Sequence, residues 1–278
     1  MEINKRRLNS ALSTLNEDER GDYYLGQFTH LLANVRATAF RPPIGFSTEI
    51  NVNQLAKRLL IVNMNLWNIA TVCHRLIWQQ TMRNDNRLSD EMWRFYGSSD
   101  IDLFFGKYRL IFDNIAQVLK TTAKAPLALP QSFNELLTWA KNPSNKSLIN
   151  DKFIRLVESC DWFIDIKNIR DSIEHDGAET VVNYNKDNVL FKISTLGRSL
   201  TNLPEKSIIN IPEITLKNNF LNFELYAGIY TGYLIWFLEE LSTLVYQEFI
   251  HQELDKESKN YHPGFMIIRT WIQCATKI

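Results

Sequence analysis

The stretch from about Gln54 to Met82 contains no glycine or proline and carries apolar residues around most of a helical surface. A helix that is apolar nearly all round has to be buried on several sides, so this segment predicts the centre of a helical core. Asn51 or Asn53 can cap its N-terminus. Only ten glycines and eight prolines occur in 278 residues, while aromatic residues make up 12%. Because helix breakers are so few, the sequence predicts a mainly α protein built as a helical bundle.

Capping residues and hydrophobic spacing predict further helices on both sides of this segment. We expect residues 1–20 to form a loose arm or short helix. Short helices are expected over about 89–97 and 131–140, and further helices over about 22–39, 101–120, 144–175, 218–253 and 263–278. Between the later helices, Thr180–Tyr184 and Val189–Ile193 flank a polar turn. β-Branched and aromatic residues around such a turn predict a small β-hairpin insert near residues 179–195. The expected organisation is an N-terminal helical extension over residues 1–50 and one helical domain over residues 51–278.

Charge and cysteine usage narrow the class of protein. Lys plus Arg and Asp plus Glu both number 31. A net charge of zero gives no global electrostatic case for nucleic acid and favours self-association. Cys73, Cys160 and Cys274 lie among apolar residues at long spacings, which predicts buried free thiols in a reducing compartment instead of disulfides or a zinc site. We therefore expect a cytoplasmic protein that needs no metal or other cofactor.

The sequence gives no sign of membrane insertion. The N-terminal residues have no apolar stretch behind them, so no signal peptide is expected. The most hydrophobic run, residues 225–238, has 14 residues, whereas a helix needs about 20 to span a bilayer. This run is expected to be a core or dimer helix.

The most suggestive polar cluster is Arg170-Asp171-Ser172-Ile173-Glu174-His175, just before Gly177. Gly177 predicts the end of the helix, because glycine favours the left-handed position that follows a helical C-terminus. An imidazole moves protons near neutral pH, and a guanidinium binds a phosphate through two parallel hydrogen bonds. Asp171 precedes His175 by four residues, so we expect it to orient the ring. Such a set supports metal-independent RNA cleavage, in which the 2′-hydroxyl of the substrate is the nucleophile.

Helical spacing adds a constraint on this cluster. Residues five apart on an ideal helix point about 140° away from each other, so we expect Arg170 and His175 not to share one face of a continuous helix. Either the helix breaks between them, or a second copy of the motif completes the site across a dimer. A purely structural alternative also stands: Arg170 and Glu174 form an ordinary ion pair, and His175 stabilises the helix C-terminus.

The cluster resembles the motif of the HEPN superfamily (higher eukaryotes and prokaryotes nucleotide-binding domains). In that family an Arg, often followed by Asn, Asp or His, precedes a His by four to six residues near the end of a bundle helix. Arg170, Asp171 and His175 match this pattern, with Asp171 in place of the more familiar Asn. The resemblance is clear over this helix and extends less specifically over residues 101–120 and 218–253. The hairpin and the N-terminal extension lie outside the minimal family bundle.

The resemblance implies a metal-independent ribonuclease of toxin or antiviral defence systems, acting as a homodimer. Arg170 and His175 would act on the scissile phosphate, with Asp171 and Glu174 in support. The resemblance is equally compatible with a catalytically inactive module for dimerisation and for binding nucleotide, RNA or protein. The implied partners are a second copy of the chain, RNA or a nucleotide, and an antitoxin or other protein.

Other polar and aromatic groups favour structural roles. His74 and Arg75 are expected to form a satisfied buried pair, and Glu248 with His251 a solvated face instead of a metal site. The aromatic residues between Phe220 and Phe237 are expected to form core or dimer seam. Acidic residues on the motif helix are expected to face partly outward, where their negative charge would repel RNA. Nearby basic residues are expected to offset this charge. The acids are Glu158, Asp161 and Asp165, and the bases are Arg155, Lys167 and Lys192.

Overall fold

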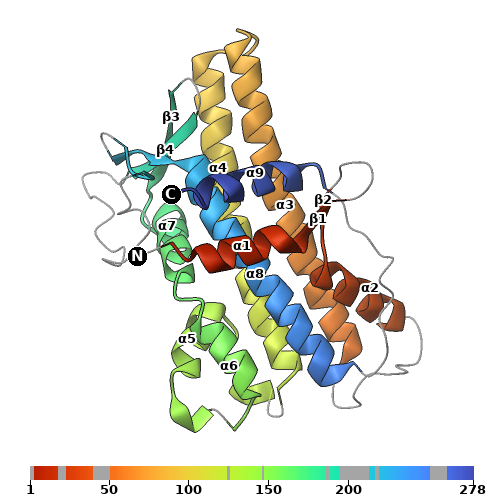
Figure 1. Ribbon diagram of the computed structural model, residues 1–278. Helices are drawn as coiled ribbons and strands as arrows, with labels where there is room; N and C mark the ends of the chain where they lie inside the picture. Colours follow the sequence, from red (N-terminus) through yellow and green to blue (C-terminus); the bar gives the residue numbers. More distant parts are fainter. Residues whose placement is uncertain are drawn as a thin grey trace.

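The computed structural model describes residues 3–17, 23–39, 51–123, 126–145, 147–185, 188–194, 213–216, 219–250 and 262–278. Within these ranges the protein is mainly helical with small antiparallel sheets, which confirms the predicted fold class (Figure 1). The helices are α1 (Lys5–Thr14), α2 (Gln27–Ala39), α3 (Val52–Asn84), α4 (Asp90–Thr121), α5 (Phe133–Ala140), α6 (Asp151–Glu158), α7 (Phe163–His175), α8 (Phe223–Phe249) and α9 (Gly264–Ala275). The strands are β1 (Leu15–Glu17), β2 (Tyr23–Leu25), β3 (Glu179–Asn185), β4 (Asn188–Ser194) and β5 (Leu221–Asn222).

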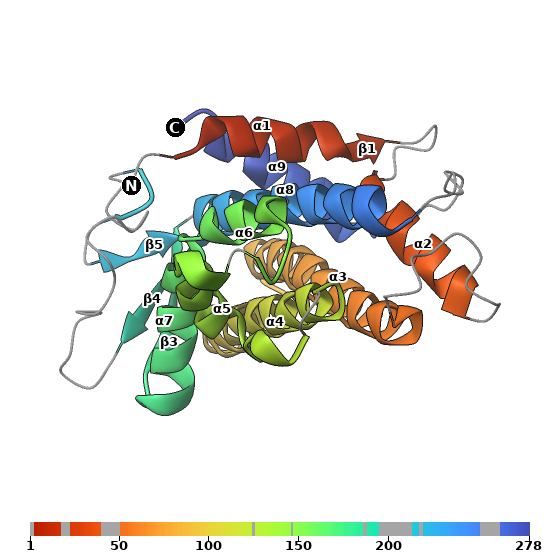
Figure 2. The ribbon, with the colours of Figure 1, turned by 90° about the horizontal axis from the view of Figure 1, so that it is seen from below.

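Helix α8 is the central layer of the bundle. Figure 2 shows α1 and α9 on one side of α8 and the antiparallel pair α3 and α4 on the other. The α3–α4 pair also extends beyond the other helices at one end of the molecule (Figure 1). Helix α8 is apolar nearly all round, which is what a helix covered on both faces requires.

The aromatic residues of α8 lie in the core of a single chain. Tyr226, Tyr230, Tyr233 and Phe237 are fully buried, which confirms the prediction of core packing. Their side chains contact aromatic residues of other elements, including Phe105 and Trp162. These four rings are therefore not a surface on which a second copy could dock.

Two predicted helix boundaries in the middle of the chain are wrong. Ser98-Ser99-Asp100 does not begin a new helix, since α4 runs without a break from Asp90 to Thr121. The Ser98 and Ser99 hydroxyls donate to carbonyl oxygens one turn earlier, and Asp100 is buried against Gln79 of α3 instead of acting as a cap. Gly97 lies inside the helix and faces β3, with Val182 Cγ1 3.4 Å from where a Cβ would lie, which is an ordinary van der Waals distance.

The helix expected over residues 144–175 is two helices. Asn150 caps α6, which ends at Glu158, and turns through Ser159–Trp162 lead into α7. The hydrophobic pattern continues through this turn because Cys160 and Trp162 are both buried. The hydrophobic pattern of the sequence therefore resembled that of one continuous helix.

The β insert is confirmed and gains a third strand. Strands β3 and β4 form an antiparallel hairpin in which Val182 pairs with Phe191, and β5 adds to β4 through Leu221. The sheet packs against α4, where the Thr180 hydroxyl donates to Asp102 Oδ1 at 2.5 Å. Since β3 follows α7 directly, this contact also places the end of α7 beside α4.

The N-terminal elements pack on the bundle. Helix α1 lies against α8, and the Asn4 amide donates to the Tyr233 hydroxyl at 2.7 Å. Helix α2 begins at Gln27, later than the expected residue 22, because Tyr23–Leu25 pairs as β2 with β1. The carboxylate of Glu239 on α8 caps α2, accepting from the Gln27 and Phe28 amides at 2.8 and 3.2 Å.

The cysteine prediction is confirmed in part. Cys73 and Cys160 are buried free thiols, but Cys274 is exposed near the end of α9. Burial raises the pKa of the Cys73 and Cys160 thiols, so neither is a reactive thiolate at neutral pH. The sequence did not distinguish Cys274 because α9 is amphipathic and its apolar neighbours lie on the opposite face.

We predict opposite effects on stability from alanine at two helical glycines. A Cβ at Gly264 would overlap the backbone of Ala70, where α9 crosses α3, whereas Gly106 in α4 has no heavy atom within 4 Å of a Cβ position. Gly264→Ala should lower the free energy of unfolding by about 1–3 kcal/mol through overpacking. Gly106→Ala should raise it by roughly 0.5–1 kcal/mol through helix propensity. Urea unfolding of both variants tests this, and equal effects would contradict the α3–α9 contact.

The buried cap at Glu239 predicts a pH-dependent stability. Burial raises the pKa of Glu239 from 4.5 to about 7, although the two α2 amides act in the opposite direction. Because the folded state binds the proton more tightly, this stabilisation is full below pH 4.5 and is lost as pH rises through 7. Glu239→Gln removes that loss, so its free energy of unfolding relative to wild type should rise by up to about 3 kcal/mol between pH 4.5 and 8. The comparison needs urea unfolding at several pH values. A difference that does not change with pH would rule out this assignment.

Candidate functional site

The predicted motif occupies the last two turns of α7. The helix ends at His175, and Gly177 follows with φ +65, in the left-handed position that the sequence predicted. The Asp176 and Ala178 amides both donate to the Ser172 carbonyl, at 3.2 and 3.0 Å, which closes the helix end. His175 is exposed, so it lies at a solvent-facing terminus where a proton can be exchanged with a ligand.

Arg170 and His175 meet within one chain, contrary to the expectation from helical spacing. Arg170 Nη1 lies 3.1 Å from His175 Nε2, although α7 is continuous between the two residues. Helical spacing gives only the radial direction of each side chain, whereas the long arginine side chain reaches around the last turn to the ring. Neither a break in the helix nor a second copy is needed to bring the two groups together.

The same guanidinium also binds two acidic side chains. Nη1 donates to Asp171 Oδ1 at 3.0 Å, and Nη2 forms an ion pair with Glu174. The expected Arg170–Glu174 pair is thus confirmed. Arg170 Nε is buried and has no hydrogen-bond partner, so the guanidinium retains a donor that a small shift of the side chain would expose.

The contact with Arg170 favours one tautomer of the neutral His175 ring. A guanidinium can only donate, so Nε2 has to accept and therefore carries no proton when this hydrogen bond forms. In the neutral ring the proton is then on Nδ1. An unprotonated Nε2 at an exposed position is the form of histidine that a general base requires.

Asp171 holds cations and does not orient the ring. Lys167 Nζ donates to Asp171 Oδ2 at 2.7 Å, while Oδ1 accepts from Arg170. Burial by itself would raise the pKa of Asp171, but the hydrogen bonds from Lys167 and Arg170 and the charge of Arg109 lower it overall. Asp171 therefore remains ionised in acid and holds the Arg170 side chain in place.

The acidic residues predicted to face outward differ in their environment. Glu158 and Asp161 are exposed as expected, on α6 and in the turn before α7. Asp165 is instead buried and accepts a hydrogen bond from the Tyr230 hydroxyl at 2.5 Å. This contact fixes α7 on α8, so one of the three charges expected to oppose RNA is inside the protein.

The basic residues expected to offset the acids also differ in their environment. Arg155 is exposed on α6, Lys167 is bound to Asp171, and Lys192 lies over the Phe220 ring with Nζ 4.9 Å from its centroid. Arg109 of α4, which the sequence did not single out, has a charge that also acts on Asp171. No local pattern could have identified it, because α4 and α7 are brought together only by the tertiary fold.

The remaining candidate sites carry little chemistry. His74 and Arg75 are both exposed, so the predicted buried pair is wrong. Arg75 instead forms an ion pair with the buried Asp100. Glu248 pairs with Lys152 at 3.7 Å, while His251 lies outside the described residues. In the described ranges no three His, Cys, Asp or Glu side chains form a group that could hold a metal ion.

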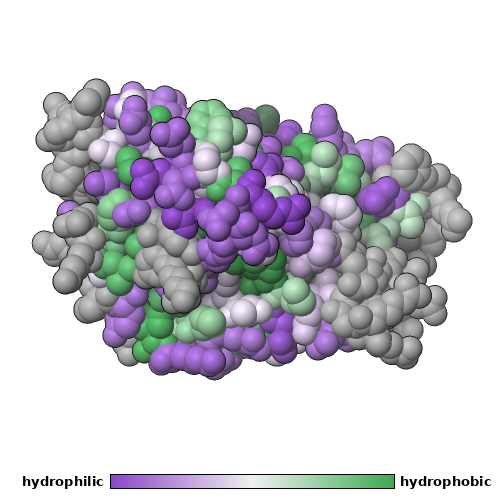
Figure 3. Space-filling view, turned by 90° about the horizontal axis from the view of Figure 1, so that it is seen from above, coloured by the Kyte–Doolittle hydropathy of each residue, from purple (hydrophilic) through white to green (hydrophobic). Residues whose placement is uncertain are grey.

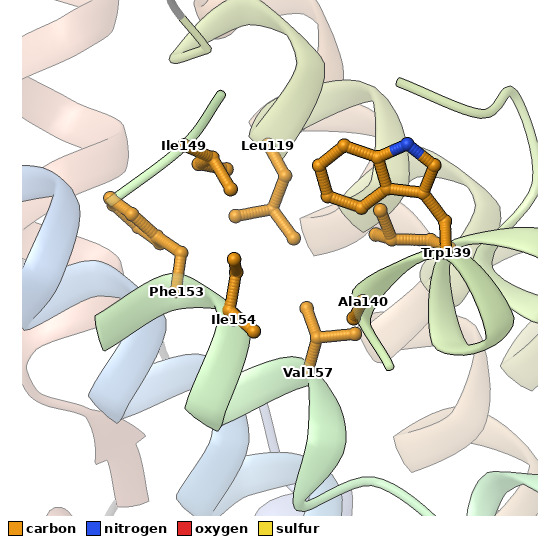
Figure 4. Close-up of a pocket in the computed structure, with 8 residues that line it drawn as sticks. Leu119, Trp139, Ala140, Ile149, Phe153, Ile154 and Val157 are labelled. Carbon is orange, nitrogen blue, oxygen red and sulfur yellow. The ribbon is translucent and has the colours of Figure 1, made fainter. Parts of the chain in front are cut away.

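A hollow between α4, α5 and α6 is too small and too apolar to bind a substrate or cofactor. Figure 4 shows its lining, which includes Leu119, Trp139, Phe153 and Val157. The space open to the centre of a water molecule is about 10 Å³, which is at the limit for one water. It has no polar lining, so we assign it to imperfect packing of the short helices.

The protein matches no known family model, no curated protein and no solved structure. Over the part of the chain that the structure describes, no helix combines the length and the apolarity needed to cross a membrane.

The contact between Arg170 and His175 predicts the tautomer of the ring. We expect the neutral His175 ring to carry its proton on Nδ1 in the wild type, because Nε2 accepts from Arg170. In Arg170→Met this donor is absent, so both neutral tautomers should be populated. Long-range ¹H–¹⁵N spectra of the ring distinguish the tautomers, and His74, exposed on α3, is the internal control. A wild-type ring protonated on Nε2 would contradict the contact.

Proposed function

We propose that the protein is a HEPN-like, metal-independent endoribonuclease in which His175 and Arg170 act on one phosphodiester of RNA. The observation that carries the proposal is the 3.1 Å contact between Arg170 Nη1 and His175 Nε2 at the exposed end of α7. A proton acceptor and an always-charged phosphate ligand are the two groups that such a cleavage requires. The likeness of Arg170, Asp171 and His175 to the family motif supports the same function.

In the proposed reaction, His175 Nε2 accepts the proton of the 2′-hydroxyl. The 2′-oxygen then forms a bond to the adjacent phosphorus, and the bond from phosphorus to the 5′-oxygen breaks. Arg170 donates hydrogen bonds to the non-bridging oxygens, where negative charge increases in the transition state. The proton held by His175 is returned to the departing 5′-oxygen, so the products are a 2′,3′-cyclic phosphate and a 5′-hydroxyl.

A second candidate function is a non-catalytic module that binds nucleotide, RNA or a protein partner. One observation favours it: Arg170 is already engaged by the carboxylates of Asp171 and Glu174. A phosphate has to displace at least one of these contacts before it can bind to the guanidinium. We further propose a homodimer, in which a second copy would supply another Arg170–His175 pair, in a toxin or antiviral setting as the family likeness implies.

The test is cleavage of a mixed RNA pool in EDTA by the purified protein. His175→Ala should lower the rate by about 10²–10⁴-fold, the usual contribution of a general acid–base group. Arg170→Ala should also lower it by about 10²–10³-fold through loss of transition-state stabilisation. The ends of the fragments should be 2′,3′-cyclic phosphates.

Matched controls separate catalysis from contamination and misfolding. His74→Ala removes an exposed histidine on α3, and Arg155→Ala removes an exposed arginine on α6. Both should cleave at the wild-type rate. Wild-type protein that binds RNA without cleaving it would favour the binding module. Cleavage that survives His175→Ala would exclude the proposed site.

A further inference from the structure

Helix α3 carries a row of side chains outside the core at a strict seven-residue spacing. The row consists of Lys57, Met64, Thr71, Trp78 and, just after the helix, Asp85. Met64 is 57% exposed and Trp78 is 54% exposed. Seven-residue spacing keeps side chains on one side of a helix, where they pack against another helix. The buried residues of α3 are centred on its opposite side, so the row is available for a contact outside the core.

Helix α4 carries a second exposed row with the same spacing. Its members are Tyr96, Leu103 and Leu110, all exposed. Among the described residues, eight of the eleven exposed large apolar side chains belong to α3 or α4. Figure 2 shows this helix pair on the side of α8 opposite α1 and α9. We call the two rows together the outer face of the α3–α4 pair; a concentration of exposed apolar groups of this kind marks an interaction surface.

The α3 row is complementary to itself about Thr71. A second copy of α3 that runs antiparallel and is centred on Thr71 would place Met64 against Trp78 of that copy. The same arrangement places Lys57 against Asp85 of the second copy, and both of these charged residues are exposed. An interface with two-fold symmetry has to match itself in this way. The opposite charges at the two ends of the row therefore favour a second copy as the occupant of this face.

The α4 row is centred at nearly the same level. Tyr96 and Leu110 lie seven residues before and after Leu103. Arg75 of α3 forms an ion pair with Asp100 of α4. Because the two helices are antiparallel, counting four residues back from Arg75 and four forward from Asp100 places Thr71 beside Phe104. Thr71 and Leu103 are thus at about the same level, within one helical turn, so one two-fold axis serves both rows.

The outer face is large enough for a stable dimer. The stretch from Lys57 to Asp85 is about 42 Å long, and two adjacent helices are about 20 Å wide. The area of this face is therefore about 800 Å² per copy, which is what each partner typically buries in a specific interface. One half of the pair also extends beyond the other helices (Figure 1), so neighbouring helices do not block it.

We propose that the outer face of the α3–α4 pair is a homodimer interface. Two copies stack face to face about a two-fold axis at the level of Thr71 and Leu103, with equivalent helices antiparallel. This inference builds on the homodimer proposed above by naming its surface, and it does not require RNA cleavage. Thr180 binds Asp102 near the level of the axis, so the ends of both α7 helices lie on the same edge of this dimer.

The first experiment is crosslinking at the predicted axis, where a residue meets its own copy. Cys274 is exposed, so the variants carry Cys274→Ser. In this background Leu103→Cys should give a covalent dimer with a short bis-maleimide in dilute solution. Met266→Cys is the matched control, because Met266 on α9 is 55% exposed but lies outside the outer face. The control should remain monomeric on a denaturing gel.

The second experiment measures the dimer dissociation constant by sedimentation. Trp78→Ala should raise it by about 30-fold or more, as loss of a buried aromatic anchor does, whereas Met266→Ala should leave it unchanged. Lys57→Glu and Asp85→Lys should each raise it by about tenfold, and the double variant should restore it to within about threefold of wild type. All four residues are exposed, and thermal unfolding of each variant checks that the fold is retained.

The outcomes separate this inference from the proposed function. A wild-type protein that remains monomeric at micromolar concentration overturns the interface, whatever else binds to the outer face. A dimer that Trp78→Ala and the charge reversals leave unchanged, or that crosslinks equally well at Met266, overturns it as well. A dimer with the expected responses that cleaves no RNA supports the interface and removes the endoribonuclease, whereas a monomer that cleaves RNA does the reverse.

Discussion

The fold depends on hydrogen bonds that join buried polar side chains of α8 to the surrounding helices. Tyr230 donates to Asp165 of α7, Thr231 accepts from Tyr108 of α4, and Glu239 accepts from the first amides of α2. Each of these contacts selects one neighbouring helix at one position along α8. Apolar packing alone would tolerate sliding between helices, whereas a buried hydroxyl or carboxylate without its partner is costly. The central helix therefore sets the register of its neighbours through a few polar contacts.

The sequence predicted the elements better than their boundaries. The long helix beginning after Asn51, the hairpin insert and the aromatic core all follow from capping and periodicity, which are local properties. The errors at Ser98–Asp100 and at Ser159–Trp162 have a common origin. Serine and aspartate cap helices or lie within them according to what packs nearby, and buried turns share the apolar pattern of helices. Only tertiary contacts, such as that of Asp100 with Gln79, decide between these cases.

For the candidate site, the sequence predicted which residues gather at the end of α7 but not the contacts among them. The motif residues Arg170 and His175 and the closing Gly177 are close in sequence, so their grouping was predictable. The direct contact between the guanidinium and the ring was not predictable, because it depends on side-chain rotamers. The effect of the Arg109 charge on Asp171 was beyond any local pattern, since it depends on how α4 packs against α7. Seen from the end where α3 and α4 protrude, the hydrophobic groups of the described residues on this face form small separate areas among hydrophilic ones (Figure 3).

The position of the motif at the joint between α7 and β3 has an evolutionary consequence. Asp165 holds the first turn of α7 on α8, and the Thr180 hydroxyl holds the start of β3 on α4. The connection between the helix and the strand is short, because Gly177 ends the helix directly before the strand begins. Descendants of this sequence can therefore exchange side chains around His175 and alter its chemistry. They cannot readily lengthen the segment that carries it, so diversification here should proceed by substitution and not by insertion.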